Sequence, residues 1–123
     1  MLHKIDVGDN KVVGFRWEGK YDEKGVKQSF VQFLPELQAR PEMNLYLEVG
    51  SLTEVEAKAI WEEVRFDIKN LQQIVKKIEK VALVTDMKWM RTMAETSATL
   101  FPGIDLKAFS FKETDAARGF VTD

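Results

Sequence analysis

The chain of 123 residues contains no cysteine and a single histidine. Without thiols it can form neither disulfides nor thiolate zinc sites, so a disulfide-stapled secreted scaffold and a cysteine nucleophile are both excluded. A serine, histidine and acid triad would have to use His3, which lies in a predicted edge strand, far from the carboxyl ends of parallel strands where α/β sites form. We therefore interpret His3 as a surface residue and predict a protein that is not an enzyme.

The chain also lacks a large excess of charge of either sign, since it has 18 basic and 20 acidic residues and a net charge of −2. Nucleic-acid binding thereby loses its main driving force. No apolar run approaches the ~20 residues that span a bilayer, and no secretory leader pattern opens the chain. The seven glycines are scattered rather than gathered in phosphate-binding loops. We expect a cytoplasmic protein with no cofactor, no metal, no nucleic-acid partner and no membrane span.

What the sequence does contain is a buried strand that runs directly into a helix start, at residues 80–89. Residues 81–84 are consecutive apolar residues, which is typical of a strand covered on both faces or at the centre of a sheet. Thr85 and Asp86 follow as candidate N-caps, and Trp89 begins a helical apolar face.

Strand and helix patterns alternate along the rest of the chain. The predicted strands are 2–7, 11–18, 43–49, 80–84 and 104–111, and the predicted helices are 21–40, 54–79, 87–101 and 113–121. Pro35 is expected to kink or break the first helix. The segment 54–79 is expected to bend at residues 65–67, because one helix of that length would overshoot a small domain. In the last helix, Ala116, Ala117 and Phe120 are expected to face inward.

This alternation predicts an α/β fold in one domain over residues 1–123: a mostly parallel sheet of about five strands with an antiparallel N-terminal edge strand. If the strands lie in sequence order, the helices gather mainly on one face. The other face should then be uncovered, and polar residues on the second and third strands fit that arrangement. This candidate interaction face consists of Arg16, Glu18, Asn44, Tyr46 and Glu48.

The stretches FRWEGKYD, KVALVTDMKW, LFPGIDLKAF and ETDAARGFV, taken with this order of elements, resemble the SpoIIAA-like family of STAS-related proteins. The resemblance implies a strand and helix superhelix shared with CRAL-TRIO lipid-transfer domains. Anti-sigma-factor antagonists of the STAS group carry a phosphorylated serine in an Asp-Ser-x-Gly-type motif, and the matching place here is residues 50–53. That motif's Asp and Gly are absent, so we interpret Ser51 and Thr53 as N-caps, in a capping box with either Glu54 or Glu56.

Strand ends and helix starts are expected to meet at a rim, where the free backbone donors of helix N-termini suit an anion. This candidate ligand or switch rim comprises Ser51, Thr53, Thr85, Asp86, Lys88 and Trp89. The CRAL-TRIO resemblance also implies an apolar pocket between helices and sheet. Its candidate lining is Phe30, Phe33, Trp61 and Trp89. The competing interpretation is capping at the rim and core packing of the aromatic residues, because a small chain needs most of its apolar side chains to fill its core.

Two functions remain open from the sequence. The first is a non-enzymatic regulatory or adaptor module that binds a protein partner, which could be a second copy of the chain as a homodimer, through the uncovered sheet face or the helix starts. The alternative is a carrier or sensor of a small apolar or lipid-like ligand held between the helices and the sheet.

Overall fold

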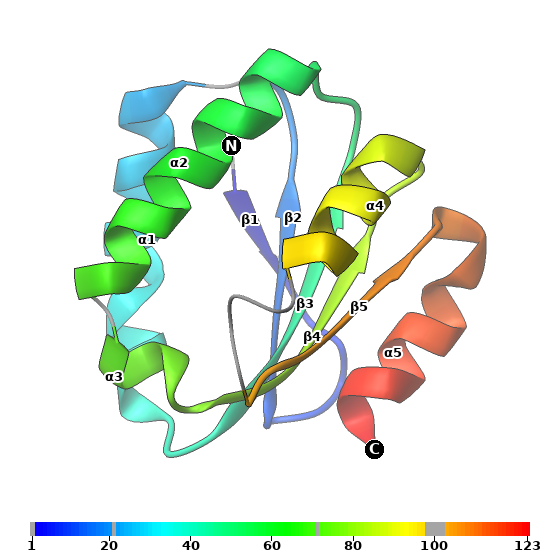
Figure 1. Ribbon diagram of the computed structural model, residues 1–123. Coiled ribbons are helices and arrows are strands. Elements are labelled where there is room, and N and C mark those ends of the chain that lie inside the picture. Colours follow the sequence, from blue (N-terminus) through cyan, green and yellow to red (C-terminus); the bar gives the residue numbers. More distant parts are fainter. Residues whose placement is uncertain (1, 21, 71, 98–102) are drawn as a thin grey trace.

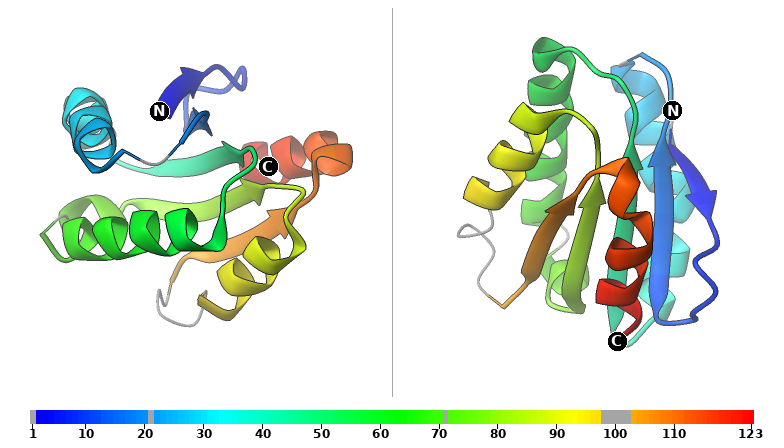
Figure 2. Two further views of the ribbon diagram at one scale, coloured as in Figure 1. Left: turned by 90° about the horizontal axis from the view of Figure 1, so that it is seen from above. Right: turned by 90° about the vertical axis from the view of Figure 1, so that its right-hand side faces the viewer.

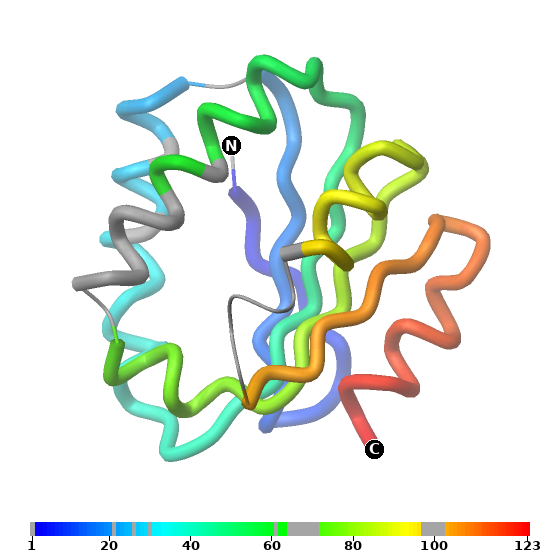
Figure 3. Tube along the Cα trace, viewed as in Figure 1, coloured from blue at the N-terminus to red at the C-terminus, as the bar shows by residue number. Residues whose placement is uncertain are grey.

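The computed structural model describes residues 2–20, 22–70, 72–97 and 103–123, without the side chains of residues 26, 30, 61, 64–70 and 97. Figure 1 labels the elements and Figure 3 traces the chain through them. The strands are β1 (Leu2–Ile5), β2 (Val12–Trp17), β3 (Met43–Val49), β4 (Ile78–Val84) and β5 (Asp105–Phe109). The helices are α1 (Glu23–Ala39), α2 (Glu54–Asn70), α3 (Gln72–Val75), α4 (Lys88–Ser97), the short 3-10 helix η2 (Phe111–Glu113) and α5 (Thr114–Thr122).

The five strands form one sheet in the order β1-β2-β3-β4-β5. β1 is antiparallel to β2, and every later neighbour is parallel. Each helical crossover therefore moves the chain one strand further in the same direction. The predicted α/β fold with a mixed sheet and an antiparallel N-terminal edge strand is confirmed.

The helices α1, α2 and α4 cover one face of the sheet (Figure 2). Strand residues on this face are apolar, as the alternation in 43–49 predicts. Towards α1 and α3, the buried cluster comprises Val13, Phe15, Met43 and Ile74. Towards α2 and α4, it comprises Trp17, Val49, Ala57, Leu83 and Met90.

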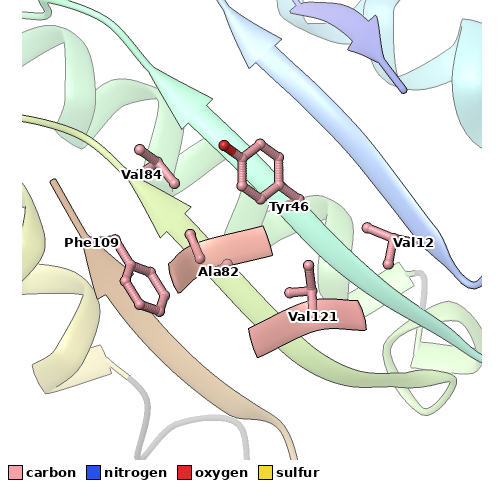
Figure 4. Close-up of a cluster of buried hydrophobic side chains, with 7 residues drawn as sticks. Val12, Tyr46, Ala82, Val84, Phe109 and Val121 are labelled. Atoms are coloured by element: carbon pink, nitrogen blue, oxygen red, sulfur yellow. The ribbon is translucent and has the colours of Figure 1, made fainter. Parts of the chain in front are cut away.

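Helix α5 packs on the opposite face of the sheet and covers part of it, so the prediction that no helix covers this face is wrong. Figure 4 shows the resulting cluster, in which side chains of β2 to β5 meet α5. Its buried members are Val12, Tyr46, Ala82, Val84, Phe109, Ala117 and Val121. The rule of right-handed crossovers fixes the face of a helix that connects two parallel strands. Because α5 follows the last strand and connects no pair, that rule leaves its face open.

Helix α1 continues through Pro35, so a break into two helices does not occur. A proline leaves the carbonyl four residues earlier without its helical donor. Here that carbonyl belongs to Val31, which is 71% exposed. Water can therefore bond the carbonyl that Pro35 leaves free.

The predicted helical segment 54–79 divides at a different place from the one expected. Helix α2 passes unbroken through residues 65–67, and β4 already begins at Ile78. The 17 residues of α2 span about 25 Å. A seven-residue strand such as β3 spans about 23 Å. One helix of this length therefore crosses the sheet once without overshooting it.

In the C-terminal helix α5, two of the three residues predicted to face inward pack against the sheet. Ala117 is fully buried and Phe120 packs against the same cluster, as predicted, whereas Ala116 is exposed and was wrongly placed. Val121, at 0% exposure, takes the inward position instead. The predicted end of the preceding helix at residue 101 lies outside the described residues.

In the described ranges, no helix is long and apolar enough to cross a membrane.

Candidate functional site

The carboxyl ends of β2 to β5 lie along one edge of the sheet, where α2, α4 and η2 begin (Figure 1). This edge is the rim expected from the sequence. The structure places all of the predicted rim residues there or one turn into the helices. What they do differs from one residue to the next.

At the start of α2, Thr53 forms a capping box with Glu56. The Glu56 amide donates to Thr53 Oγ1, and the Thr53 amide donates to Glu56 Oε1, both at 3.1 Å. Of the two pairings left open by the sequence, this one is formed. Ser51 and Glu54 are exposed, and Ser51 precedes the cap rather than serving as it.

Thr85 and Asp86 link the end of β4 to its surroundings and do not cap α4 in the expected way. Thr85 is fully buried, and its Oγ1 accepts from the Met87 amide at 3.3 Å. Its carbonyl accepts from Arg91 Nη1 at 2.7 Å. Asp86 Oδ1 accepts from the Phe111 amide at 2.9 Å and so ties this loop to η2. These bonds hold the rim together.

The last two predicted rim residues open α4. Lys88 is exposed. Trp89 is half-buried and packs against the cluster that includes Trp17 and Met90. The interpretation of Trp89 as a core residue therefore fits the structure. Lys88 exposes its charge to solvent at the rim.

Two exposed apolar side chains on the rim were not selected from the sequence. Val55 is 78% exposed and Phe111 is 36% exposed. The exposure of Val55 could have been predicted from its position on the helix. Each residue turns the helix by about 100°, so Val55 lies about 200° around the helix axis from the buried Ala57, on the opposite side. The start of η2 could have been predicted from the Ser-x-x-Glu spacing of Ser110 and Glu113, which is typical of a capping box. The structure shows this second capping box.

This second capping box also sets the charge beside Phe111. The Ser110 amide donates to Glu113 Oε1 at 2.9 Å. That bond, with a second from the Ser110 hydroxyl, lowers the pKa of the Glu113 carboxyl. Glu113 is therefore an anion at neutral pH.

Three of the five predicted interaction-face residues are buried rather than exposed. Asn44 is 3% exposed, Tyr46 is 0% exposed and Glu48 is 3% exposed. Asn44 Nδ2 donates to the Val121 carbonyl of α5 at 2.7 Å, and its Oδ1 accepts from the Lys80 amide at 3.0 Å. The polar side of β3 is thus the attachment surface of α5, not a free surface.

Glu48 is the centre of a polar network near the carboxyl end of β3. Its Oε1 accepts from Arg16 Nε at 2.9 Å and from Arg16 Nη2 at 2.7 Å, and its Oε2 accepts from the Tyr46 hydroxyl at 2.6 Å. Burial raises the pKa of Tyr46 to about 12, and its hydrogen bond to Glu48 contributes to the increase. The hydrogen bond to Glu48 raises the pKa of Arg16. Both carboxylate oxygens are occupied, and the network joins β2 to β3.

Arg16 and Glu18 remain at the surface, on the part of the sheet that α5 leaves open. Their side chains are 45% and 56% exposed, and Arg16 Nη1 lies 3.7 Å from Glu18 Oε1. His3 Nε2 lies 3.7 Å from Glu18 Oε2, with 55% of the His3 side chain exposed. His3 is therefore a surface residue, as the sequence indicates.

The predicted apolar lining does not come together at one place among the described side chains. The Phe33 ring lies 4.9 Å from the Phe15 ring, in the cluster towards α1. Trp89 belongs to the other cluster, towards α4. The side chains of Phe30 and Trp61 lie outside the description, so their part of the prediction stays a prediction.

A shallow hollow lies on the surface of α1. It has a volume of about 340 Å³ and is lined by Lys27, Gln28, Val31 and Gln32. None of these four residues belongs to the predicted lining, so this hollow is not the pocket expected between the helices and the sheet. Across the described part of the chain, no three histidine or acidic side chains converge to hold a metal ion.

Comparisons with known proteins agree on the fold. A family model described as SpoIIAA-like matches residues 12–122. A similar solved structure is that of an uncharacterised protein of the DUF3478 family from Shewanella loihica PV-4, which has a SpoIIAA-like fold. It is 16% identical, with a TM-score of 0.66 over 98% of this chain and 92% of that one. No curated protein matches.

Proposed function

Since the chain belongs to the SpoIIAA-like family, we propose that this domain is a non-enzymatic interaction module that binds a protein partner through the rim at the carboxyl ends of the strands. The observation that carries the proposal is the exposure of Val55 and Phe111 at that rim, at 78% and 36%. Exposed apolar side chains that are gathered on one edge of a protein can mark an interaction surface, whereas isolated ones are common.

The chemistry of the rim indicates what kind of surface it fits. Val55 and Phe111 lie on the first and last of its segments, and the exposed Asp86 and Lys88 lie on the segment between them. A partner with two apolar contacts separated by a polar, charged strip would match. The aromatic ring of Phe111 is the better candidate for an energetic centre, because buried aromatic side chains carry much of the binding energy in interfaces.

The geometry also supports the rim over the sheet face proposed from the sequence. Most of that face lies under α5, and the hydrogen bonds of Asn44 and Glu48 are formed within the chain. Docking there would have to displace α5 from the sheet. The rim, by contrast, includes the starts of α2 and η2, whose capping boxes are formed within the chain, so a partner can bind there without unfolding either element.

The test compares two variants with matched chemistry. The double substitution Val55→Glu and Phe111→Glu places charge at the rim, and Val31→Glu places charge on α1 at a site that is 71% exposed. Each protein is immobilised, and the proteins captured from a lysate of its own organism are quantified by mass spectrometry. We expect at least one captured protein to be lost from the rim variant but retained by Val31→Glu, and to bind again as a purified protein.

If every captured protein binds the rim variant as well as it binds the unsubstituted chain, the rim is not the interaction surface. Circular dichroism of both variants shows whether the fold is retained. Both carry their changes at exposed positions, so a loss of structure is not expected.

A further inference from the structure

The sheet ends on one side at β5, and in the described part of the chain no strand pairs with its outer edge. An edge strand presents a row of unpaired backbone groups that can pair with another chain. The direction of those groups on β5 follows from one hydrogen bond. The Thr85 amide donates to the Phe109 carbonyl at 2.9 Å, so Phe109 directs its backbone towards β4.

Because backbone groups alternate along a strand, Asp105 and Lys107 also direct their backbone towards β4. Leu106 and Ala108 direct theirs outward, to the open edge. The side chains alternate in the same way. Lys107 lies on the α5 face, where its Nζ is 5.9 Å from the Phe120 ring centroid.

We infer that β5 pairs with β5 of a second copy, antiparallel and centred on Leu106. A two-fold axis at Leu106 places that residue opposite itself, as a pair that exchanges both backbone hydrogen bonds. It then places Asp105 opposite Lys107 of the second copy, and Lys107 opposite Asp105 of the second copy. Both are non-hydrogen-bonded pairs, in which side chains are closest.

Charge selects this register over its neighbours. A centre at Lys107 would place two lysines opposite each other, and a centre at Asp105 would place two aspartates opposite each other. Like charges directly opposite destabilise a strand pair, and opposite charges stabilise it. Both exposed residues of β5 are therefore complementary to a second copy in one register only.

The other edge of the sheet lacks this property. β1 carries His3 and Lys4, and Lys4 is paired with Glu36 of α1. Self-pairing of β1 brings together basic residues without an acidic one on the strand. The two edges therefore differ, and the complementary one is β5. The resulting dimer would have one continuous sheet across both copies.

The test is a charge swap within β5. Asp105→Lys alone and Lys107→Asp alone each turn both interstrand pairs into like-charge pairs. The double substitution, Asp105→Lys with Lys107→Asp, restores opposite charges and the original net charge. Analytical ultracentrifugation of the three variants and the unsubstituted chain over a range of concentrations measures the dimer dissociation constant.

We expect each single substitution to weaken the dimer about tenfold or more, and the double to recover most of that loss. Lys76→Asp is a matched control, because Lys76 is exposed on the segment before β4 and the charge change is the same as in Lys107→Asp. This control should leave the dissociation constant unchanged.

Hydrogen exchange gives a second measurement at the same edge. The Leu106 and Ala108 amides should become protected as concentration rises, whereas the Lys107 amide should be protected at every concentration. An unsubstituted chain that stays monomeric at the highest attainable concentration overturns the inference. So does a dimer that neither single substitution weakens. Neither outcome bears on the rim, which lies on a different edge of the sheet.

Discussion

Each face of the sheet contributes to a buried core, but the two cores are built from different chemistry. The face towards α1, α2 and α4 is apolar, with Met43 at 1% exposure among its strand residues. The face towards α5 mixes apolar residues with Asn44, Tyr46 and Glu48. Buried polar groups are tolerated when their hydrogen bonds are made, and here they are. A polar strand side therefore marks a specific attachment as readily as it marks a surface.

The largest effect is expected on the apolar face. Met43→Ala removes a fully buried side chain and leaves a cavity, so the free energy of unfolding should fall by about 2–5 kcal/mol. Val31→Ala, at an exposed site, should change it by less than about 0.5 kcal/mol. Chemical denaturation measures both. Equal effects of the two substitutions would contradict the assignment of Met43 to the core.

On the polar face, the expected effect depends on which partner is removed. Arg16→Met leaves the Glu48 carboxylate buried without its cation, which should cost about 3 kcal/mol. Adding Glu48→Gln removes that charge and keeps an acceptor for the Tyr46 hydroxyl, so the double variant should recover more than half of the loss. Denaturation of both variants tests this coupling. A double variant no more stable than Arg16→Met would show that the carboxylate is not confined as described.

Glu18→Gln is the control for that experiment. It removes the exposed partner of Arg16, and exposed ion pairs are worth at most about 1 kcal/mol. Its effect should therefore be clearly smaller than that of Arg16→Met.

Among the substitutions of buried networks, the smallest expected effect comes from the Tyr46 hydroxyl. Tyr46→Phe removes its hydrogen bond to Glu48 and should cost about 1.5–2 kcal/mol. The pKa of Tyr46 is raised from 10.0 to about 12. In that pH range the folded chain holds a proton that the unfolded chain has lost, so stability should fall as pH rises from 10 towards 12.

Tyr46→Phe should lack this fall in stability. Chemical denaturation between pH 10 and about 12 measures the stability of both proteins. Absorbance titration assigns the phenol that ionises, since the chain has two tyrosines and the variant retains only Tyr21. If the unsubstituted chain and the variant lose stability equally over that range, Tyr46 does not titrate as described.

Much of the architecture could be predicted because it depends on local pattern. Alternation in β3 predicted its two faces correctly. The consecutive apolar residues of β4 predicted a buried strand, and its carboxyl end, Ala82 to Val84, is buried. The position of α5 could not be predicted in the same way. Its inward residues are apolar whichever face it covers, and no crossover rule applies to it.

The candidate site was predictable only in outline. Parallel strands end at one edge by geometry, so the rim followed from the strand assignments alone. Which side chains bond there depends on distances between loops, as in the bond from the Phe111 amide to Asp86. The exposure of Val55 could have been found from its helical phase, whereas nothing in the local sequence indicated that Glu48 would be enclosed.

The strand order has a consequence for how the chain reaches this structure. Because each strand lies beside its predecessor in the sequence, every pairing closes a loop of one helical crossover or less, and no strand must be inserted between two that are already paired. Folding rates fall as the sequence separation of native contacts increases. The sheet can therefore grow by successive addition from β1 to β5, and we expect it to fold faster than a doubly wound sheet of the same length.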